Sequence, residues 1–352
     1  MRIVITGASG NVGTALLRAL AGTGHEIVGL CRRPPPPAPP YDAARWVALD
    51  LTATDTRELG LVFDGADAVV HLAWGFQPSH DVDHLRRLDV EGTRTVVGAA
   101  RAAGVAHLVH QSSVGVYSPG RGPVDESWPT GGIDTLAYSK HKVAAERLLD
   151  EHEREHPDRP SVARMRPGLI GQRAAGSALL RYGLPPYVPA ALLRHVPVLP
   201  LDRDFVVPMV HASDVADAIV RVLERRATGP FNLAADPPIT RDVIASVLHA
   251  RPVHVLKQVL RAIVDVTWRL RLQPLDPGWV DLAFAIPLLN TGRARRELDW
   301  APRVRADAVL AEVIEGMADR AGTPSPVLRA RSAMAELLAA AVGRPIDRRP
   351  RP

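Results

Sequence analysis

The sequence contains one cysteine and no uncharged apolar run of the length that crosses a membrane. Because Cys31 is alone among 352 residues, an internal disulfide and a multi-cysteine metal centre are excluded, and no metal site is predicted. The residues from position 2 onward fit a strand and not the apolar region of a leader peptide. Together with the single cysteine, this leads us to expect a reducing, cytoplasmic compartment. Without about 18 consecutive apolar residues, no membrane span is expected either.

A strong charge of one sign is also missing from most of the chain. The formal net charge is +5, but the last 32 residues hold six arginines and two carboxylates, which account for nearly all of it. A basic stripe of the kind that follows a nucleic-acid backbone is therefore not expected on the folded part, and the prediction is no nucleic-acid partner. We interpret the arginine-rich end as a solvated tail.

The segment closest to a membrane helix is residues 255–272, "VLKQVLRAIVDVTWRLRL". Its charged residues recur every four positions and leave one apolar helical face; they are Lys257, Arg261, Asp265 and Arg269. We expect this amphipathic helix to pack on the protein core. Contact with a membrane surface is the alternative for such a pattern.

What the sequence does contain is an alternation of short apolar strands and helical stretches through its first two-thirds. Strands are predicted at 2–6, 26–31, 46–49, 68–72, 107–112 and 161–166, and helices near 11–22, 54–60, 85–103 and 137–155. Strands joined by helices of this length form right-handed βαβ units. The expected fold class is α/β, a Rossmann-type doubly wound parallel sheet with a smaller, mainly helical C-terminal substrate domain.

The expected domain boundaries follow from where this alternation weakens. After residue 167 prolines become frequent, and a strand-and-helix pair returns at 206–226, followed by a strand at 230–235. Residues 1–166 and about 205–236 are assigned to the nucleotide-binding domain, and about 167–204 and 237–320 to the substrate-binding region. Residues 321–331 are interpreted as a linker, 332–342 as a short helix, and the rest as an Arg/Pro-rich tail that ends at 352.

The segment "TGASGNVG" at residues 6–13 lies between the first strand and the first helix. Gly7 permits a tight turn, Gly10 lets the backbone approach a pyrophosphate, and Gly13 lets the helix lie close to the sheet. The free N–H groups at the helix start, near Asn11 and Val12, and the helix dipole favour an anion there. The segment therefore predicts a nucleotide-binding site.

Tyr138 and Lys142 lie four residues apart in the predicted helix 137–155, so they share one helical face. A free tyrosine has a pKa of about 10, too high for an acid/base group at neutral pH. A lysine ammonium beside it would favour the phenolate and lower that pKa. By itself this spacing also fits a solvated helix whose tyrosine packs on the core.

Several motifs in one order resemble those of the extended branch of the short-chain dehydrogenase/reductase superfamily, the NAD(P)-dependent epimerase/dehydratase family. The glycine spacing T-G-x-x-G-x-x-G is the first of them. The others are "LDL" (49–51), "HLAW" (71–74), "DVEGT" (89–93), "SSVGVY" (112–117), "RMRPG" (164–168), "VHASDVADAI" (210–219) and "NTGRARRELDWAP" (290–302). The resemblance covers residues 1–320 at varying strength.

This resemblance implies a catalytic set of Ser113, Tyr138 and Lys142. Tyr138, with its pKa lowered by Lys142 and by the positive nicotinamide ring, would give or take a proton at a substrate oxygen that Ser113 holds. Lys142 would also hold the nicotinamide ribose. The cofactor-binding residues that the resemblance implies are Gly7, Gly10, Asn11, Val12, Gly13, Arg32, Asp50, Leu51, Leu72, Ala73, Tyr138, Lys142 and Pro167.

Two of these implications have open alternatives. Asp50 would contact the adenine ring, but an aspartate after a strand also fits a helix cap. Family members often form homodimers through a four-helix bundle that includes the tyrosine-bearing helix, and for this chain a homodimer is an open expectation.

The residues that end the second strand bear on the choice of cofactor. An acidic residue there would accept bonds from the ribose 2′-hydroxyl of NAD, but this chain has Cys31, Arg32 and Arg33. A guanidinium can bind a 2′-phosphate, and no carboxylate is present there to repel one. The predicted cofactor is NADP(H), with NAD as the alternative.

Three residues depart from the family pattern. Asp89 stands where the family usually has an asparagine, and an aspartate cannot donate in a proton relay. Gly168 stands where nucleotide-sugar enzymes often carry a substrate-contacting asparagine, and Arg203 lies further from His211 than in those enzymes. The last two departures disfavour a nucleotide-sugar substrate. His211 is expected to be a buried, bonded residue at a helix start and Asp214 to be the N-cap.

The predicted function is an NAD(P)-dependent oxidoreductase that transfers hydride at a carbonyl or alcohol carbon of a small-molecule substrate, with Tyr138 as the acid/base. A sugar-nucleotide epimerase or dehydratase with tightly bound NAD is one alternative. A non-catalytic protein that senses NADP(H) or acts as a scaffold is the other, and Asp89 keeps it open. Trp74, Trp268 and Trp279 are expected in the core, with a substrate pocket as the alternative.

Overall fold

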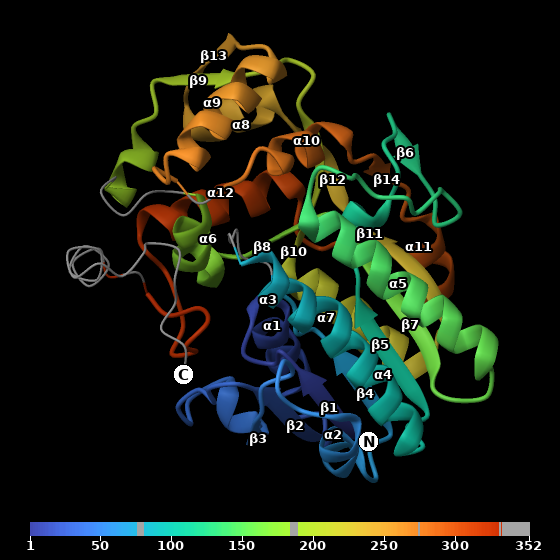
Figure 1. Ribbon diagram of the computed structural model, residues 1–352. Helices are drawn as coiled ribbons and strands as arrows, with labels where there is room; N and C mark the ends of the chain where they lie inside the picture. Colours follow the sequence, from blue (N-terminus) through green and yellow to red (C-terminus); the bar gives the residue numbers. More distant parts are fainter. Residues whose placement is uncertain (76–80, 184–188, 274, 331, 333–352) are drawn as a thin grey trace.

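Seven parallel strands form the central sheet of the computed structural model, which describes residues 1–75, 81–183, 189–273, 275–330 and 332 (Figure 1). The strand order is β11-β7-β5-β4-β1-β2-β3, and every neighbouring pair is parallel. The bounds are β1 Arg2–Thr6, β2 Glu26–Cys31, β3 Arg45–Ala48, β4 Ala68–His71, β5 His107–Gln111, β7 Ser161–Pro167 and β11 Gly229–Leu233. All of the strands predicted in the first two-thirds of the sequence are present within one or two residues, and the doubly wound α/β prediction is confirmed.

Helices cover both faces of this sheet because alternate side chains of each strand point to opposite faces. Ile3 and Ile5 of β1 belong to the core cluster under α1 (Asn11–Leu20) and α7 (Ala212–Arg225). Val4, between them, belongs to the cluster on the other face. That second cluster lies under α2 (Thr56–Phe63), α4 (Gly92–Ala102) and α5 (Ala137–Glu155).

The single helix expected near 85–103 is interrupted. The structure has α3 (Val82–Arg86), a π-helical turn at Arg87–Glu91 and then α4. Asp89 in this turn is 1% exposed, and its carboxylate accepts a hydrogen bond from the Gly75 amide at 2.7 Å. A π-helical turn commonly brings a functional side chain inward, and here it turns Asp89 toward the site described below.

The C-terminal region combines small sheets with helices. Its sheets are β12-β10-β8, β13-β9 and β14-β6, with β6 Pro123–Val124, β8 Leu169–Gly171, β9 Val198–Leu201, β10 Val206–His211, β12 Ala235–Thr240, β13 Arg251–His254 and β14 Leu288–Leu289. Its helices include α6 (Gly176–Gly183), α8 (Arg241–Leu248), α9 (Lys257–Arg269), α10 (Gly278–Ala285), α11 (Gly292–Leu298) and α12 (Ala306–Ala318). The strand at 206–211 was assigned to the nucleotide-binding domain, but in the structure it pairs with β8 and β12 in a separate small sheet. The strand predicted at 230–235 is present as β11 and does join the seven-stranded sheet.

The amphipathic helix expected at 255–272 is present as α9, but none of its residues is buried. One apolar stripe along it is exposed, made of Leu256, Val259, Ile263, Val266 and Leu270. The expected packing on the core is therefore only partial, because the apolar face of α9 is wider than the surface that it covers. Within the described ranges, no helix is both long and apolar enough to cross a membrane.

The segment interpreted as a linker is folded where the structure describes it. Leu328 is 1% exposed and packs against Ala175 and Ala178. The backbone amide of Ser177 donates to the carbonyl of Ala321 at 2.8 Å. Residues 322–330 are therefore part of the folded chain. The helix predicted at 332–342 and the tail lie outside the described residues, apart from Ser332.

Two glycines allow α6 and α12 to cross closely. A Cβ on Gly176 would lie 2.2 Å from the backbone of Gly316. We expect Gly176→Ala to lower the free energy of unfolding by about 2 kcal/mol, because the helices must move apart. Gly60→Ala is the matched control, since a Cβ on Gly60 in α2 would meet nothing within 4 Å. That variant should be more stable by about 0.5–1 kcal/mol. Urea unfolding measures both, and equal effects would contradict the close crossing.

Candidate active site

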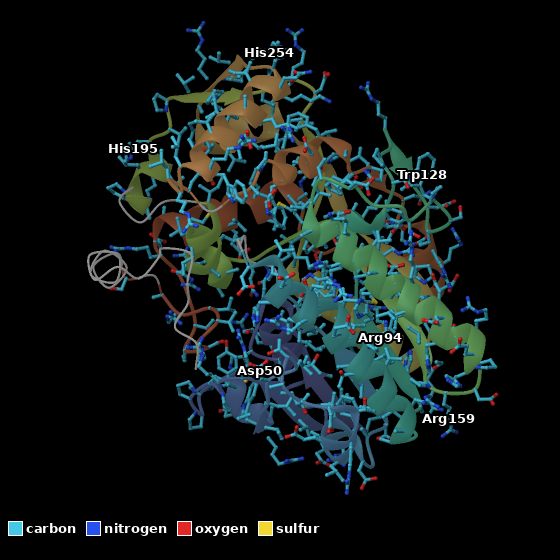
Figure 2. The ribbon with its side chains drawn as sticks, viewed as in Figure 1. Asp50, Arg94, Trp128, Arg159, His195 and His254 are labelled. Atoms are coloured by element: carbon cyan, nitrogen blue, oxygen red, sulfur yellow. The ribbon has the colours of Figure 1, made fainter. Side chains whose placement is uncertain are left out.

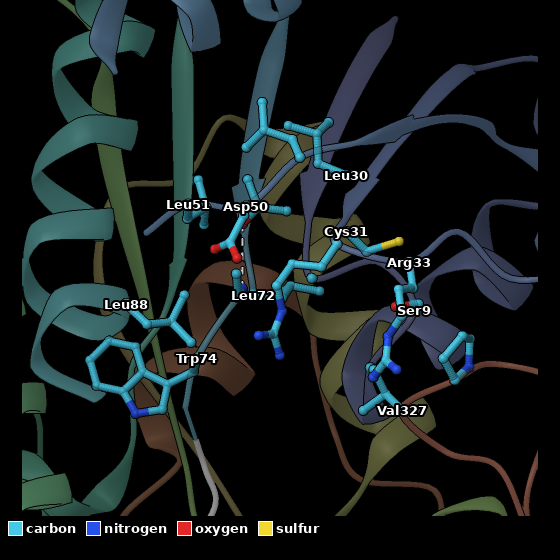
Figure 3. Close-up of a pocket in the computed structure, with 17 residues that line it drawn as sticks. Ser9, Leu30, Cys31, Arg33, Asp50, Leu51, Leu72, Trp74, Leu88 and Val327 are labelled. Carbon is cyan, nitrogen blue, oxygen red and sulfur yellow. Dashed lines mark hydrogen bonds between the residues drawn. The ribbon is translucent and has the colours of Figure 1, made fainter. Parts of the chain in front are cut away.

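A cavity of about 150 Å³ lies at the carboxyl ends of β1, β2 and β4 (Figure 3). The carboxyl ends of parallel strands are where α/β folds bind ligands. Seven of the predicted cofactor-binding residues line it, namely Gly7, Gly10, Arg32, Asp50, Leu51, Leu72 and Ala73. The others do not line this cavity: Asn11, Val12, Gly13, Tyr138, Lys142 and Pro167.

Two glycines of the loop after β1 are required by space. Gly7 has φ +69°, and a Cβ there would lie 2.6 Å from the amide nitrogen of Ala73. A Cβ on Gly13 would lie 2.4 Å from the carbonyl oxygen of Ala8. The loop after β1 thus packs directly on the loop after β4, and α1 starts directly beneath it.

The first turn of α1 begins at this loop without a side-chain cap. Its N-cap residue is Gly10, and no side chain accepts from the free amides at Asn11–Gly13. The side chains of Asn11 and Val12 serve other purposes: Asn11 accepts from Gln172, and Val12 belongs to the core. An uncapped helix N-terminus beside a glycine cradle fits the pyrophosphate of a dinucleotide.

Asp50 projects into the same cavity. Its carboxylate accepts hydrogen bonds from the amide and the hydroxyl of Thr52, at 2.9 and 2.8 Å. The cap of α2 is Asp55, so Asp50 is not a helix cap. The residues of this cavity fit the adenosine and pyrophosphate end of a nicotinamide dinucleotide.

Sequence reasoning missed one wall of the cavity. Pro326 and Val327 line it together with Arg32 and Arg33, and Figure 3 shows Val327 beside Arg33. The segment around them carries no periodic pattern or motif, so it was interpreted as a linker. Its place at the cavity depends on contacts across the whole length of the chain.

The predicted acid/base group lies at the start of α5. The side chains of Tyr138 and Ser113 lie together beside Gly115, where an added Cβ would be 3.4 Å from Oγ of Ser113. Ser113 follows β5 and also accepts from the amide of Gly115 at 3.0 Å. A Cβ on Gly115 would lie 3.2 Å from the ring of Tyr138, so this glycine lets the ring come close. The structure thus brings Ser113 and Tyr138 together as expected.

Lys142 lies one turn further along α5 and is 2% exposed. Its ammonium group donates to the carbonyl of Gln111 at 2.6 Å and lies 3.3 Å from the centroid of the Trp74 ring. Burial lowers the pKa of Lys142 to about 7, while the carboxylates of Asp89 and Glu146 act in the opposite direction. Near neutral pH this lysine is therefore only partly protonated.

The expected lowering of the tyrosine pKa does not arise from the residues of the chain. Burial raises the pKa of Tyr138 to about 12, the hydrogen bond from Ser113 lowers it, and the negative charge of Asp89 raises it further. The prediction that Lys142 lowers this pKa is wrong for the conformation in the structure. The ammonium group of Lys142 faces Gln111 and Trp74. Burial lowers its pKa, so the group is only partly protonated near neutral pH.

Trp74 connects the cavity to the acid/base group. Its indole lines the cavity, and the ring of Tyr138 stands edge-on to it with the centroids 6.4 Å apart. Trp279 of α10 packs on Tyr138 from another element, with the centroids 5.3 Å apart. The expected place of these two tryptophans was the core, and their proximity to Tyr138 is a tertiary contact that the sequence pattern does not reveal.

Asp89, which stands where the family usually has an asparagine, is paired with His141. The carboxylate of Asp89 accepts from the amide of Gly75 and lies 3.0 Å from Nδ1 of His141. His141 directly precedes Lys142 in α5 and is 7% exposed. A buried carboxylate needs such partners because its charge is otherwise unsolvated.

A buried ion pair supports the floor of the site. The guanidinium of Arg166 in β7 pairs with Glu146 in α5, and both side chains are almost fully buried. Arg166 also donates to the hydroxyl of Tyr117 at 3.1 Å, which itself donates to Asn232 at 2.6 Å. Burial by itself would lower the pKa of Arg166, but the hydrogen bond and the charge of Glu146 raise it above its ordinary value, so the charge persists at all ordinary pH values.

The structure also shows where the other two departures from the family pattern, Gly168 and Arg203, lie. A Cβ on Gly168 would lie 2.5 Å from the carbonyl oxygen of Pro208, so no side chain fits there. Arg203 lines a second cavity of about 450 Å³ near His254, and Ser113, Tyr138 and Lys142 do not line it. Figure 2 shows His254 at the opposite end of the molecule from Asp50.

At the start of α7, His211 is bonded as expected, but its side chain is 15% exposed and thus not buried, contrary to the expectation. His211 is the N-cap residue and accepts from the amide of Ser213. Asp214 is not the N-cap: it lies in the first turn and accepts from the amide of Val304 at 3.2 Å.

Comparisons with known proteins identify the family of the chain. The family model described as "NAD dependent epimerase/dehydratase family" matches residues 3–234. An uncharacterized protein of Mycobacterium tuberculosis is 26% identical over 325 residues, which is 92% of this chain and 31% of that protein. The chain thus spans about a third of the length of the first curated relatives that it matches.

Two further similarities differ in what they support. The sterol-4-alpha-carboxylate 3-dehydrogenase (decarboxylating) of Saccharomyces cerevisiae is 27% identical over 280 residues, which cover 72% of this chain and 78% of that enzyme. The crystal structure of a UDP-glucose-4-epimerase from Stenotrophomonas maltophila with bound NAD has a TM-score of 0.68 at 20% identity. It covers 90% of this chain and 98% of that chain and supports the fold alone. Together with the family match over the sheet and the glycine loop, these findings confirm the resemblance: the chain belongs to the NAD-dependent epimerase/dehydratase family, the extended type of short-chain dehydrogenase/reductase.

Proposed function

We propose that this chain is an NADP(H)-dependent oxidoreductase that interconverts a carbonyl and an alcohol carbon of a small-molecule substrate, with Tyr138 as the acid/base. The observation that carries the proposal is the placement of Ser113 and Tyr138 side by side at Gly115. Trp74 lies edge-on to the Tyr138 ring and also lines the nucleotide cavity. The match to the family model supports the reaction class.

The residues of the chain have distinct tasks in this reaction. The nicotinamide cofactor supplies or accepts the hydride when it is bound. The hydroxyl of Ser113 orients the substrate oxygen, and the phenol of Tyr138 donates a proton to it or takes one from it. Trp74 and Trp279 exclude water around the phenol because their rings flank it.

The preference for NADP(H) is supported by the charges at the end of β2. Cys31, Arg32 and Arg33 line the cavity where an NAD enzyme would place an acidic residue. A 2′-phosphate is a strong acceptor for guanidinium groups. The structurally similar UDP-glucose-4-epimerase binds NAD, but at 20% identity this does not assign NAD to the present chain.

The sugar-nucleotide alternative has less support. The glycine at 168 leaves no space for a substrate-contacting side chain, and Arg203 lies at another cavity. An epimerase would retain NAD through purification and show no net turnover of the cofactor.

Removal of the phenol tests the acid/base role. We expect Tyr138→Phe to lower kcat by about 10²–10⁴-fold, the usual contribution of a general acid/base group, with the affinity for NADPH nearly unchanged. Trp128→Phe is the control, since it is an aromatic substitution at an exposed residue. Turnover is measured with a carbonyl substrate found by screening, and binding by NADPH fluorescence. Full turnover by Tyr138→Phe would refute the mechanism.

Reversal of the charge at residue 32 tests the cofactor preference. We expect Arg32→Asp to weaken NADPH binding tenfold or more, because a charge-assisted hydrogen bond is replaced by repulsion, while NADH binds at least as well. Parallel fluorescence titrations measure both affinities. If the wild-type chain binds NADH more tightly than NADPH, or is purified with NAD, the epimerase becomes the better description.

The buried lysine gives stability a pH dependence of known sign. Its pKa is about 7 in the folded chain against an ordinary value of 10.5, so the unfolded chain binds more protons between these pH values. The free energy of unfolding should therefore rise from pH 7 to pH 9.5, by up to roughly 3 kcal/mol from this group. Lys142→Met should lack this part of the rise. Denaturant unfolding of both chains at the two pH values measures it, and identical rises would disprove the lowered pKa.

A further inference from the structure

Residues 322–330, which we call the C-terminal segment, run along the rim of the nucleotide cavity. Pro326 and Val327 of this segment line the cavity opposite Trp74 and Leu88 (Figure 3). The family match ends at residue 234, so this wall is not part of the matched region. The C-terminal segment is therefore a feature of this chain to be explained from its own contacts.

The C-terminal segment is fixed to the glycine loop and to the elements around it. The hydroxyl of Ser325 is 0% exposed and donates to the carbonyl of Ser9 at 2.6 Å. The hydroxyl of Thr323 bonds that of Tyr41 at 2.7 Å, and Tyr41 in turn bonds Thr14 of α1 at 3.0 Å.

A second set of contacts holds the far end of the segment. The guanidinium of Arg181 in α6 donates to the carbonyls of Val327 and Arg329, at 2.6 and 2.8 Å. Leu328 is buried between them against Ala175 and Ala178. The segment thus has a defined position at the cavity before any ligand binds.

The segment also holds a third arginine, Arg329, next to a residue of the cavity wall. The guanidinium of Arg329 donates to the carbonyl of Pro326 at 2.9 Å, and Pro326 is itself a wall of the cavity. Arg33 lies beside Val327, and Arg32 lines the same cavity. Burial, and after it the charges of Arg329 and Arg32, lower the pKa of Arg33.

The three cations have no carboxylate partner in the part of the chain that the structure describes. Among the described residues, none of Arg32, Arg33 and Arg329 forms an ion pair with a carboxylate, whereas arginines elsewhere on the surface do, for example Arg2, Arg173 and Arg293. Like charges held together repel one another, and a bound dianion would relieve that repulsion. A phosphate monoester offers three acceptor oxygens and a charge near −2, which matches several guanidinium donors.

We infer that Arg329 of the C-terminal segment joins Arg33 and Arg32 to bind the 2′-phosphate on the adenosine ribose of the cofactor. The inference rests on the proposed NADP(H) preference and extends it to residues outside the matched family region. It assigns to the C-terminal segment a part of the cofactor site, with Ser325 as the residue that positions it on the glycine loop. Arg329 is exposed, so its replacement leaves the core intact.

The experiment compares four probes with and without the phosphate, namely NADPH, NADH, 2′,5′-ADP and 5′-AMP. Arg329→Glu should weaken NADPH and 2′,5′-ADP by tenfold or more and change NADH and 5′-AMP less than twofold. Arg296→Glu on α11 is the control with the same change of charge at an exposed arginine, and it should alter none of the four affinities. Thermal unfolding of each variant verifies that it is folded.

The outcomes separate this inference from the proposed function. An equal loss for phosphorylated and unphosphorylated probes, or no loss at all, would overturn the role of Arg329 even if the wild-type chain prefers NADPH. A wild-type chain that prefers NADH would instead refute the proposed cofactor, and the role of Arg329 with it. Ser325→Ala should weaken the binding of the same two phosphorylated probes as Arg329→Glu, but by a smaller factor, because it only loosens the segment. Weaker binding of NADH alone would contradict the positioning role of Ser325.

Discussion

The close approach of the loop after β1 to the loop after β4 is the constraint on which the site depends. Gly7 has φ +69°, and a Cβ there would lie 2.6 Å from the amide nitrogen of Ala73, so only a residue without a side chain allows the two loops to pack. This contact makes Leu72 and Ala73 a wall of the nucleotide cavity and directs Trp74 toward α5. Lys142 and Tyr138 then pack on the indole of Trp74, so the cavity and the proposed acid/base group share one residue.

The polar groups beneath this site are buried and paired. The carboxylate of Asp89 has the amide of Gly75 and the ring of His141 as partners, and Glu146 has Arg166. Loss of one partner from such a pair leaves an unsolvated charge and costs far more than an exposed ion pair contributes. The aspartate in place of the family's asparagine is therefore part of a local pair with His141, and its charge also acts on Tyr138 and Lys142.

The C-terminal segment changes how the nucleotide cavity is enclosed. The family match ends at residue 234, yet Pro326 and Val327 form one side of the cavity. A segment that is bonded to both the glycine loop and Tyr41 links the end of the chain to its beginning. If the segment takes part in cofactor binding as we propose, cofactor affinity and the stability of this segment are coupled, since both depend on the same contacts.

The sequence alone determined the alternation of strands and helices, the glycine loop and the order of family motifs. These features follow from local requirements: side-chain periodicity within an element, and space that only glycine provides. The sequence did not determine the interruption of the helix at Arg87–Glu91, the place of Trp74 and Trp279 beside Tyr138, or the raised pKa of that tyrosine. It also did not place residues 322–330 at the cavity. Only the tertiary structure decided these, because they depend on burial and on contacts between residues 52 positions apart, as for Asp89 and His141, or 316 apart, as for Ser9 and Ser325.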